Sequence, residues 1–474
     1  MQRTRSVFAG HLSKATFIAA AFLAAAPFAH AADQAATARF GFDVDGWCED
    51  GRDVFASDGD NLIYHFWRTE HGLRPVRTLH VNPDVELCVV GPTQVYFLDP
   101  EFGILAFDRS PEAYPLIRPV YVQPPAGRGS VTPETFELID GVTGPVLVIS
   151  GQGRTVHLAA PALERYGETP TVTASAETDP VEATGDAADD PAVVAHDGTA
   201  LVLGADKQAG LRVYNMEGDE QVFLASGKLN NVDALALGEG RFLAAASNRT
   251  TIAVDLFEVE VDPLKVENAG AFALDFADPY GLCMGQVKDV PHVFVGDTTG
   301  QVEAWRPGED KAWERVLSLQ FDSQTEGCVY DAVSGLLYVG EEEAGIWSVD
   351  LDNGEKTLVH AVDGEILVAD VEGLDIYYGE DRRYLVASSQ GDDSFVVYSL
   401  PGNQRLLKFR IAANHEGGTD GASETDGLSV NPEPLPGYPA GVLVVQDGYN
   451  VAPGENQNFK IVDWRAVQAL IDRP

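Results

Sequence analysis

The chain has 474 residues, of which 73 are Asp or Glu and only 32 are Lys or Arg, so its formal net charge at pH 7 is −41. A surface this acidic repels nucleic acid and anionic lipid, and we therefore expect neither a nucleic-acid nor a membrane partner. The charge either keeps the protein soluble or serves to bind cations.

Residues 1–31 have the pattern of a secretory signal peptide. Arg3, Arg5 and Lys14 give a positive start, "ATFIAAAFLAAAPFA" is a short apolar core, and "AHA" precedes Ala32 as a small-residue cleavage site. A membrane anchor is the alternative, but the apolar run is short for a helix that crosses a bilayer. We expect a protein that is secreted or periplasmic.

Residues 35–165 contain three faint repeats that begin near Asp45, Glu86 and Glu137. Each consists of short strand-like runs separated by Gly, Asp and Pro. Three such units are too few to close a ring, and ring closure is what removes unpaired sheet edges. We expect an incomplete, about three-bladed propeller-like domain, joined to the rest by the Thr- and Ala-rich stretch around 166–185.

A stronger repeat fills residues 170–474. Its clearest copies contain "YGLCMGQV", "EGCVYDAV", "EGLDIYYG" and "DGLSVNPE", and weaker copies contain "DPAVV" and "DALAL". The copies begin at Asp190, Asp233, Tyr280, Glu326, Glu372 and Asp426. They are roughly 45 residues apart, a length typical of four-stranded propeller blades. The sequence therefore predicts an all-β fold with a six-bladed β-propeller, and "WRAVQALIDR" near the end is the one helical pattern.

Equivalent positions of successive blades lie on a circle about the propeller axis, so the repeat predicts two rings of side chains. The first ring holds the six starting residues, five carboxylates and a phenol. The second ring, at the end of the second strand, is divided between cations and oxygen donors: Lys207, Asn248 with Arg249, Asp297, Glu342, Gln390 and Asp447. Clustered oxygen donors without His or Cys suit a hard cation, above all Ca²⁺. Lys207 and Arg249 suit an anion such as phosphate.

The four cysteines, Cys48, Cys88, Cys283 and Cys328, each lie two or three residues into a repeat. This placement fits small buried residues on inner strands, and the spacing matches neither a zinc nor a redox motif. Export would permit disulfides. We expect structural thiols, or at most one bridge between neighbouring blades.

The segments "GDAADDPAVV", "GKLNNVD", "AAASNR", "SQTEG", "YVGEEEAGIW", "VEGLDIYY", "ASSQG", "TDGASETDG", "VVQDG" and "NQNFKIVDW" follow one another between about residues 170 and 464. Together they resemble the β-propeller phytases. That family is a six-bladed, calcium-dependent phosphatase of myo-inositol hexakisphosphate (phytate), so the resemblance implies a phosphoric monoester hydrolase of the 3-phytase type. The N-terminal repeats resemble the incomplete propeller of two-domain members.

The resemblance also implies the site residues. Calcium ligands at the channel mouth are expected at Tyr280, Glu326, Glu342, Asp370, Glu372, Gln390 and Asp420. A structural calcium site is expected at Asp190 with the backbone oxygens of Pro191 and Val232, and another at Asp447 and Asn450. Phosphate contacts are expected from Lys207, Lys228 and Arg249.

The expected catalytic residues are Glu326, Glu342, Glu372 and Asp420. Several Ca²⁺ ions held between them would activate a water for in-line attack on phosphorus. Because phytate chelates calcium, we expect a calcium–phytate complex as the substrate, and we expect the enzyme to be a monomer. The alternative is a non-catalytic, secreted calcium-binding propeller that binds a protein or glycan. It explains the acidity and the repeats, but not Lys207 and Arg249 opposite an acidic cluster.

Overall fold

The structure is a computed structural model, and it describes residues 40, 42, 44–58, 62–69, 72–80, 87–99, 103–109, 118–122, 134–141, 144–160, 169–414, 417–450 and 455–473. The expected signal peptide, residues 1–31, lies outside this range. The expected boundary between residues 165 and 170 also falls largely on residues that are not described. None of the helices in the described part is long and apolar enough to cross a lipid bilayer.

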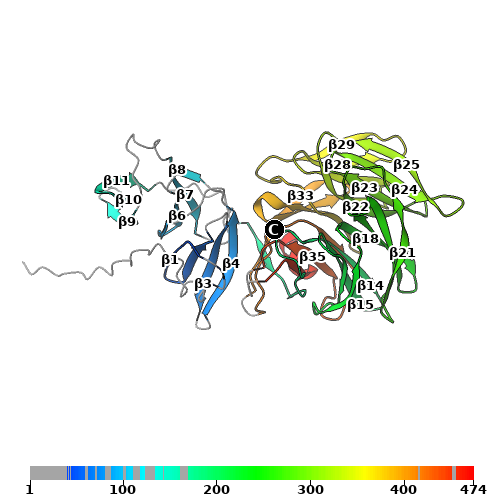
Figure 1. Cartoon of the computed structure of the whole chain (residues 1–474), viewed down its shortest axis with the longest axis horizontal. Coiled ribbons are helices and arrows are strands. Elements are labelled where there is room, and N and C mark those ends of the chain that lie inside the picture. The colour runs from blue at the N-terminus through cyan, green and yellow to red at the C-terminus, as the bar shows by residue number, and fades with distance from the viewer. Residues whose placement is uncertain are drawn as a thin grey trace, which may run out of the picture.

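Three antiparallel sheets make up the N-terminal part of the described chain (Figure 1). The first contains β1 (Gly46–Asp50), β2 (Asp53–Ser57), β3 (Leu62–Thr69) and β4 (Gly72–His80). The second contains β5 (Leu87–Val90), β6 (Gln94–Asp99), β7 (Gly103–Asp108) and β8 (Arg118–Val122). The third contains β9 (Thr135–Gly141), β10 (Gly144–Gly151) and β11 (Arg154–Ala159). Their first strands contact in succession, β1 with β5 and β5 with β9, as blades of a partial propeller do.

Six sheets follow in the described part of residues 171–463. The first is β14 (Ala188–His196), β15 (Thr199–Asp206), β16 (Gly210–Tyr214) and β17 (Glu220–Ala225). The second is β18 (Leu229–Gly238), β19 (Arg241–Asn248), β20 (Ala253–Glu260) and β21 (Lys265–Ala273). The third is β22 (Pro279–Val287), β23 (Val290–Asp297), β24 (Gln301–Pro307) and β25 (Trp313–Gln320). The fourth is β26 (Thr325–Asp331), β27 (Leu336–Glu341), β28 (Gly345–Asp350) and β29 (Lys356–Ala361).

The last two sheets each take in one strand from the start of the propeller. The fifth is β30 (Leu374–Tyr378), β31 (Arg383–Ser389), β32 (Ser394–Leu400) and β33 (Gln404–Ala412), extended by β12 (Thr171–Thr173). The sixth is β34 (Leu428–Asn431), β35 (Val442–Asp447) and β36 (Asn458–Asp463), completed by β13 (Ala176–Glu177). A 3₁₀ turn (Gln390–Asp392) follows β31, and the helix α2 (Trp464–Ile471) follows β36, where the sequence predicts a helix.

The sheets are arranged as a ring. Their first strands contact in the order β14, β18, β22, β26, β30 and β34, and β34 contacts β14 again. Neighbouring sheets share hydrophobic clusters; Leu203 and Val213 of the first sheet pack with Ala244 and Phe257 of the second. The all-β propeller fold predicted from the repeats is therefore confirmed, and the first strands line its central channel.

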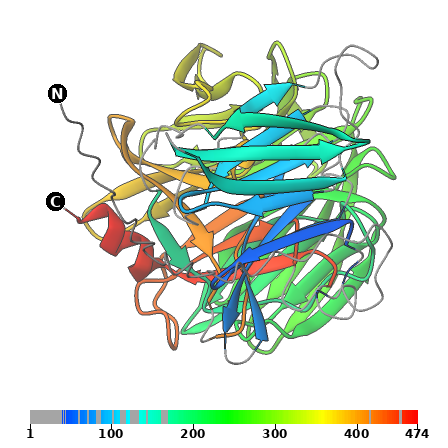
Figure 2. The same ribbon diagram turned by 90° about the vertical axis from the view of Figure 1, so that its left-hand side faces the viewer.

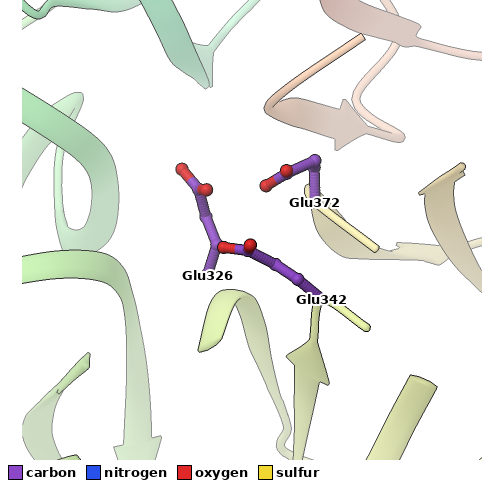
Figure 3. A group of neighbouring side chains, drawn as sticks. All are labelled: Glu326, Glu342 and Glu372. Atoms are coloured by element: carbon purple, nitrogen blue, oxygen red, sulfur yellow. The ribbon is translucent and has the colours of Figure 1, made fainter. Parts of the chain in front are cut away.

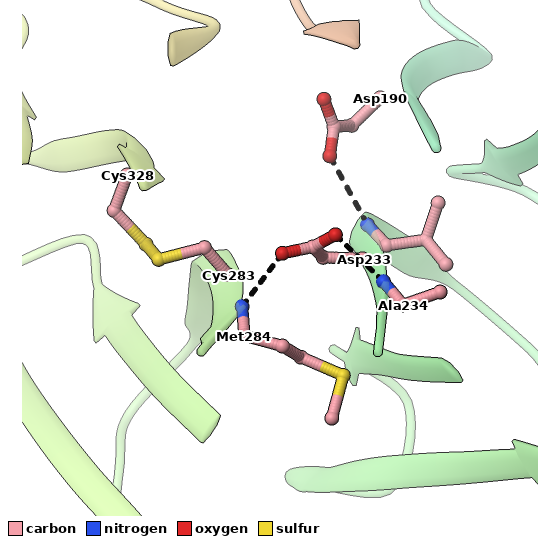
Figure 4. The surroundings of a disulfide bond; sticks show 7 residues. Asp190, Asp233, Ala234, Cys283, Met284 and Cys328 are labelled. Carbon is pink, nitrogen blue, oxygen red and sulfur yellow. Dashed lines mark hydrogen bonds between the residues drawn. A yellow bond between two sulfur atoms is a disulfide. The ribbon is translucent and has the colours of Figure 1, made fainter. Parts of the chain in front are cut away.

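Two disulfides join first strands of neighbouring sheets. Cys48 on β1 is bonded to Cys88 on β5, and Cys283 on β22 is bonded to Cys328 on β26 (Figure 4). The expectation of at most one bridge is wrong. Cysteines at equivalent heights on adjacent first strands have Cα atoms 5.6 and 5.5 Å apart, which is the separation that a disulfide needs.

Candidate functional site

The inner strands turn selected side chains toward the channel by means of β-bulges. In four sheets, two residues of the first strand have no partner in the ladder with the second strand. These residues are 189–190 on β14, 230–231 on β18, 280–281 on β22 and 326–327 on β26. On β30 and β34 the pairs 372–373 and 426–427 come just before the first ladder residue. A bulge re-aims a side chain and ends regular pairing. The residues at equivalent positions are Asp189, Asn230, Tyr280, Glu326, Glu372 and Asp426.

Glycine follows the channel residue in four of these pairs because neighbouring inner strands approach very closely. A Cβ atom on Gly281 would lie 2.0 Å from the carbonyl oxygen of Glu326. A Cβ atom on Gly327 would lie 1.8 Å from the carbonyl oxygen of Glu372. No side chain fits such a space. The recurring Gly therefore fixes the spacing at which successive acids enter the channel.

This register corrects the first ring predicted from the repeats. The prediction placed Asp190 and Asp233 level with Tyr280, whereas the bulges place Asp189 and Asn230 there. The Asn230 side-chain amide donates a hydrogen bond to Glu326 Oε1 at 2.9 Å. Asp233 instead accepts hydrogen bonds from the backbone of Met284 and Ala234 (Figure 4).

Three carboxylates converge at the channel mouth. Glu326 on β26, Glu342 just after β27 and Glu372 just before β30 offer oxygen atoms that all lie within 4.8 Å of one another. Figure 3 shows the three side chains extending from separate segments into a common space. All three residues are buried. They line a cavity of about 680 Å³, a size suited to a small-molecule ligand.

The mutual repulsion of these acids perturbs their protonation. Burial and then the charge of Glu326 raise the pKa of Glu342 to about 8. Burial and the charge of Glu326 also raise the pKa of Glu372 well above its usual range. A bound cation would offset this repulsion and favour the ionised carboxylates.

The donor set fits a hard cation. Glu372 Oε2 is buried and accepts no hydrogen bond from the described chain, so this oxygen can coordinate an ion. Tyr280, Asp370 and Gln390 line the same cavity as the three glutamates, as the resemblance implies. No His or Cys is among the described lining residues. Carboxylate, amide and phenol oxygens without nitrogen or sulfur are the ligands that Ca²⁺ prefers.

Lys207 lies on the cavity wall and is held by acids. Its Nζ is 2.9 Å from Asp186, 3.2 Å from Asp426 and 3.5 Å from Asp189. Burial alone would lower the pKa of Lys207, but the charges of Asp189 and Asp426 outweigh burial and raise it. The lysine is therefore a permanent cation beside the carboxylate cluster. Asp189 and Asp186 were absent from the predicted site.

The other two expected phosphate contacts are placed differently. The Arg249 guanidinium forms a two-pronged pair with Asp278 at 2.9 and 2.6 Å and lies 5.1 Å from the centre of the Tyr280 ring. It is next to the site but is not among the residues that line the cavity. Lys228 is exposed just before β18 and also lies outside the cavity lining.

The expected structural calcium residues Asp190, Pro191 and Val232 come together in a smaller cavity. The backbone N–H of Val232 donates to Asp190 Oδ2 at 3.2 Å. Burial is the main cause that raises the pKa of Asp190. Asp233 and Asp375 line the same small cavity, so it holds three carboxylates.

Asp420 is not brought to the carboxylate cluster, which corrects its expected place at the channel mouth. Its Oδ1 pairs with the fully buried Nζ of Lys460, and Asp447 contacts the same nitrogen at 3.1 Å. Asp420 belongs to the segment between β33 and β34, and its pair with Lys460 places it beside β36. Asn450 does line the main cavity, and its buried Oδ1 has no hydrogen-bond donor among the described residues.

Comparison with known proteins identifies the family. The family model described as "Phytase" matches residues 147–474. This chain belongs to the phytase family. A "3-phytase" of Bacillus subtilis (strain 168) is 35% identical over 323 residues, which cover 62% of this chain and 84% of that protein. The family and the enzyme class implied by the resemblance, a phosphoric monoester hydrolase, are both confirmed.

Solved structures add little to this identification. A computationally designed protein, Ika8, is 9% identical with a TM-score of 0.29, over 88% of this chain and 96% of its own. A nidogen/laminin complex is 10% identical with a TM-score of 0.37, over 62% of this chain and 97% of its own. At these scores neither similarity carries an argument.

Membership of the phytase family decides against a purely non-catalytic binding module.

Proposed function

We propose that this phytase removes phosphate from phytate only when calcium is bound at the channel mouth, and that a calcium–phytate complex is its substrate. The observation that carries the proposal is the convergence of Glu326, Glu342 and Glu372, whose oxygens lie within 4.8 Å of one another in a buried cavity. Three buried carboxylates at this separation need positive charge between them. Phosphate oxygens would be repelled by the same acids, so calcium has to accompany the substrate.

Each part of the cavity has a separate task in this proposal. The three glutamates, with Tyr280, Asp370 and Gln390, hold the ions and fix their positions. Calcium held by these residues would supply positive charge for phosphate oxygens and a water of lowered pKa as the nucleophile. Lys207 presents a fixed positive charge at the wall, where it stabilises negative charge that develops on the transferring group. Arg249 orients Tyr280 through its guanidinium and is held in turn by Asp278.

The setting of the enzyme is part of the proposal. The signal pattern in residues 1–31 supports export of the enzyme. Paired disulfides Cys48–Cys88 and Cys283–Cys328 are consistent with an oxidising compartment. We propose that the exported enzyme acts as a monomer.

The test is phosphate release from phytate by the purified mature chain. Activity should appear when calcium is added to metal-depleted protein, vanish with excess chelator and return when calcium is restored. Magnesium at the same concentration should give much less activity, because it holds its waters more tightly and demands octahedral geometry. Equal activity in calcium and in excess chelator would refute the proposed calcium dependence.

A further inference from the structure

The N-terminal sheets contribute two aromatic residues to the cavity of the propeller. Phe42 and Tyr64 of the N-terminal part line it together with Glu326, Glu342 and Glu372. Figure 2 shows the N-terminal sheets in front of the propeller in the view from the left of Figure 1. The cavity is therefore closed on one side by residues far from the catalytic repeat in sequence.

A second set of residues shows that this contact is a continuous interface. Val76, Arg77 and Thr78 of β4 line a small crevice with residues of β33 and of the loop before β34. Thr78 is the ladder partner of Tyr64, so the two residues lie side by side on β4 and β3 of the same sheet. Tyr449 of the propeller lines both the crevice and the main cavity. Burial and Glu424 are the main causes that raise the pKa of Tyr449, and Tyr64 and Asp58 add smaller contributions, so these two N-terminal residues lie near Tyr449.

The Tyr64 ring is held rigidly by its neighbours. The Phe42 ring lies 4.2 Å from it, centre to centre, and the Phe66 ring lies 6.3 Å from it. Phe66 belongs to a buried cluster with Val44 and Val54, so the aromatic group is anchored in the core of the first sheet. Burial and the charge of Asp58 raise the pKa of Tyr64, so its hydroxyl keeps its proton and can donate.

The chemistry of the two walls is complementary. The propeller wall carries the acids, which can meet phosphate only through a cation. On the N-terminal side the lining residues Phe42 and Tyr64 are uncharged, and Tyr64 offers a hydroxyl. A substrate with several phosphates has groups that do not react and that still need hydrogen-bond donors. A phenol hydroxyl can donate to a phosphate oxygen without adding charge.

We propose that Tyr64, supported by Phe42, is a substrate-positioning residue that binds a non-reacting phosphate of a polyphosphorylated substrate from the N-terminal side. This proposal rests on the proposed function of the cavity. It assigns the N-terminal sheets a direct part in selecting substrates with many phosphates over small monophosphates.

The experiment compares Tyr64→Phe and Tyr64→Ala with wild type in the full mature chain with calcium. Loss of one hydrogen bond should raise KM for phytate roughly 3- to 10-fold in Tyr64→Phe, with kcat within about twofold. Kinetics on p-nitrophenyl phosphate, which is too small to reach both walls, should not change. Tyr96→Phe is the matched control, because Tyr96 lies in the second N-terminal sheet and its hydroxyl donates to Gln94.

Binding of myo-inositol hexakissulfate, a charged analogue that cannot release phosphate, is measured by calorimetry on the same variants. Weaker binding by Tyr64→Phe but not by Tyr96→Phe supports the proposal, even if wild type releases no phosphate and the proposed function fails. Phytate KM and analogue affinity that are the same in Tyr64→Phe, Tyr64→Ala and wild type would overturn it. A parallel loss on phytate and p-nitrophenyl phosphate would also overturn it, because that pattern reports a general structural defect.

Discussion

At the scale of single residues, the buried carboxylates at the channel mouth repel one another, and a bound cation would offset this repulsion. Glu326 contributes to all of this repulsion. After burial, its charge is the largest cause that raises the pKa of Glu342 and of Glu372. For Tyr280 the charge of Glu326 is the largest cause of the raised pKa. One side chain thus couples three potential ligands. Its replacement should affect ion binding and turnover together.

Glu326→Gln should lower kcat for phytate by roughly 100-fold or more and reduce stabilisation by calcium. At 100 times its dissociation constant, an ion stabilises wild type by about 2.7 kcal/mol, and the variant should show much less. Glu355→Gln, at an exposed turn between β28 and β29, is the control. Calorimetry with and without calcium measures the shift in Tm. A variant with wild-type turnover and an unchanged calcium shift would contradict this assignment.

At the scale of strands, the repeats predicted the fold well because each blade has the same alternation of apolar and turn residues. They predicted Tyr280, Glu326 and Glu372 correctly as neighbours, because a glycine follows each of them and aligns the copies. They misplaced the ring on β14 and β18, where the bulges hold Asp189–Asp190 and Asn230–Asn231 without a glycine. Sequence periodicity does not show which of two adjacent polar residues a bulge turns inward.

The repeats also could not predict contacts between residues that are far apart in the sequence. Asp420 lies in the segment between two repeat units, and only the fold shows that it pairs with Lys460. The sequence did not predict that Phe42 and Tyr64 line the cavity, because nothing in it relates the N-terminal sheets to the mouth of the channel. The chemistry of the site could be read from the sequence, but its opposite wall could not.

The disulfide between β22 and β26 should stabilise the propeller at the place where the acids are held. Cys328 lies two residues after Glu326, and the bridge closes a separation of 45 residues. The chain-entropy model gives about 4 kcal/mol for a loop of this length. Cys283→Ser combined with Cys328→Ser should lower the denaturation midpoint of the propeller and weaken calcium binding.

The matched control is Cys48→Ser combined with Cys88→Ser, which removes the equivalent bridge between β1 and β5. That variant should weaken the N-terminal sheets and leave the calcium affinity of the cavity unchanged. Urea titrations followed by calcium calorimetry separate the two effects. Equal calcium affinities in the two double variants would show that the propeller bridge does not position the acids.

At the scale of the whole molecule, the first N-terminal sheet should lose stability in acid because it contains a buried pair of His65 and Asp53. Burial lowers the pKa of His65 to about 4, although its hydrogen bond with Asp53 opposes this shift. The unfolded chain binds this proton near pH 6.5, so folding loses stability as pH falls from about 6.5 to about 4. The full shift corresponds to about 3 kcal/mol.

Asp53 extends this loss to lower pH. Burial would raise its pKa, but hydrogen bonds from His65 and Arg109 outweigh burial and lower the pKa to about 2. Its contribution is therefore present above about pH 4 and is lost between there and pH 2. Hydrogen-exchange protection factors, corrected for intrinsic rates, should fall for β3 between pH 6.5 and 4.5 before they fall for β19. Simultaneous loss in both strands would contradict the prediction, and His65→Gln should flatten the dependence in β3.

The ring is completed by pairing between its two ends, because β12 joins β33 and β13 joins β36. During synthesis, residues 171–173 leave the ribosome 239 residues before their partners at 410–412, and residues 176–177 leave it more than 280 residues before theirs at 460–461. Until then the blades already made form an open stack with an unpaired edge, which is exposed to the edges of other nascent chains. A chain that stopped before Asn458 would contain every acid of the channel mouth and still lack the strand that seals the ring. Closure of the propeller therefore waits for the synthesis of β36.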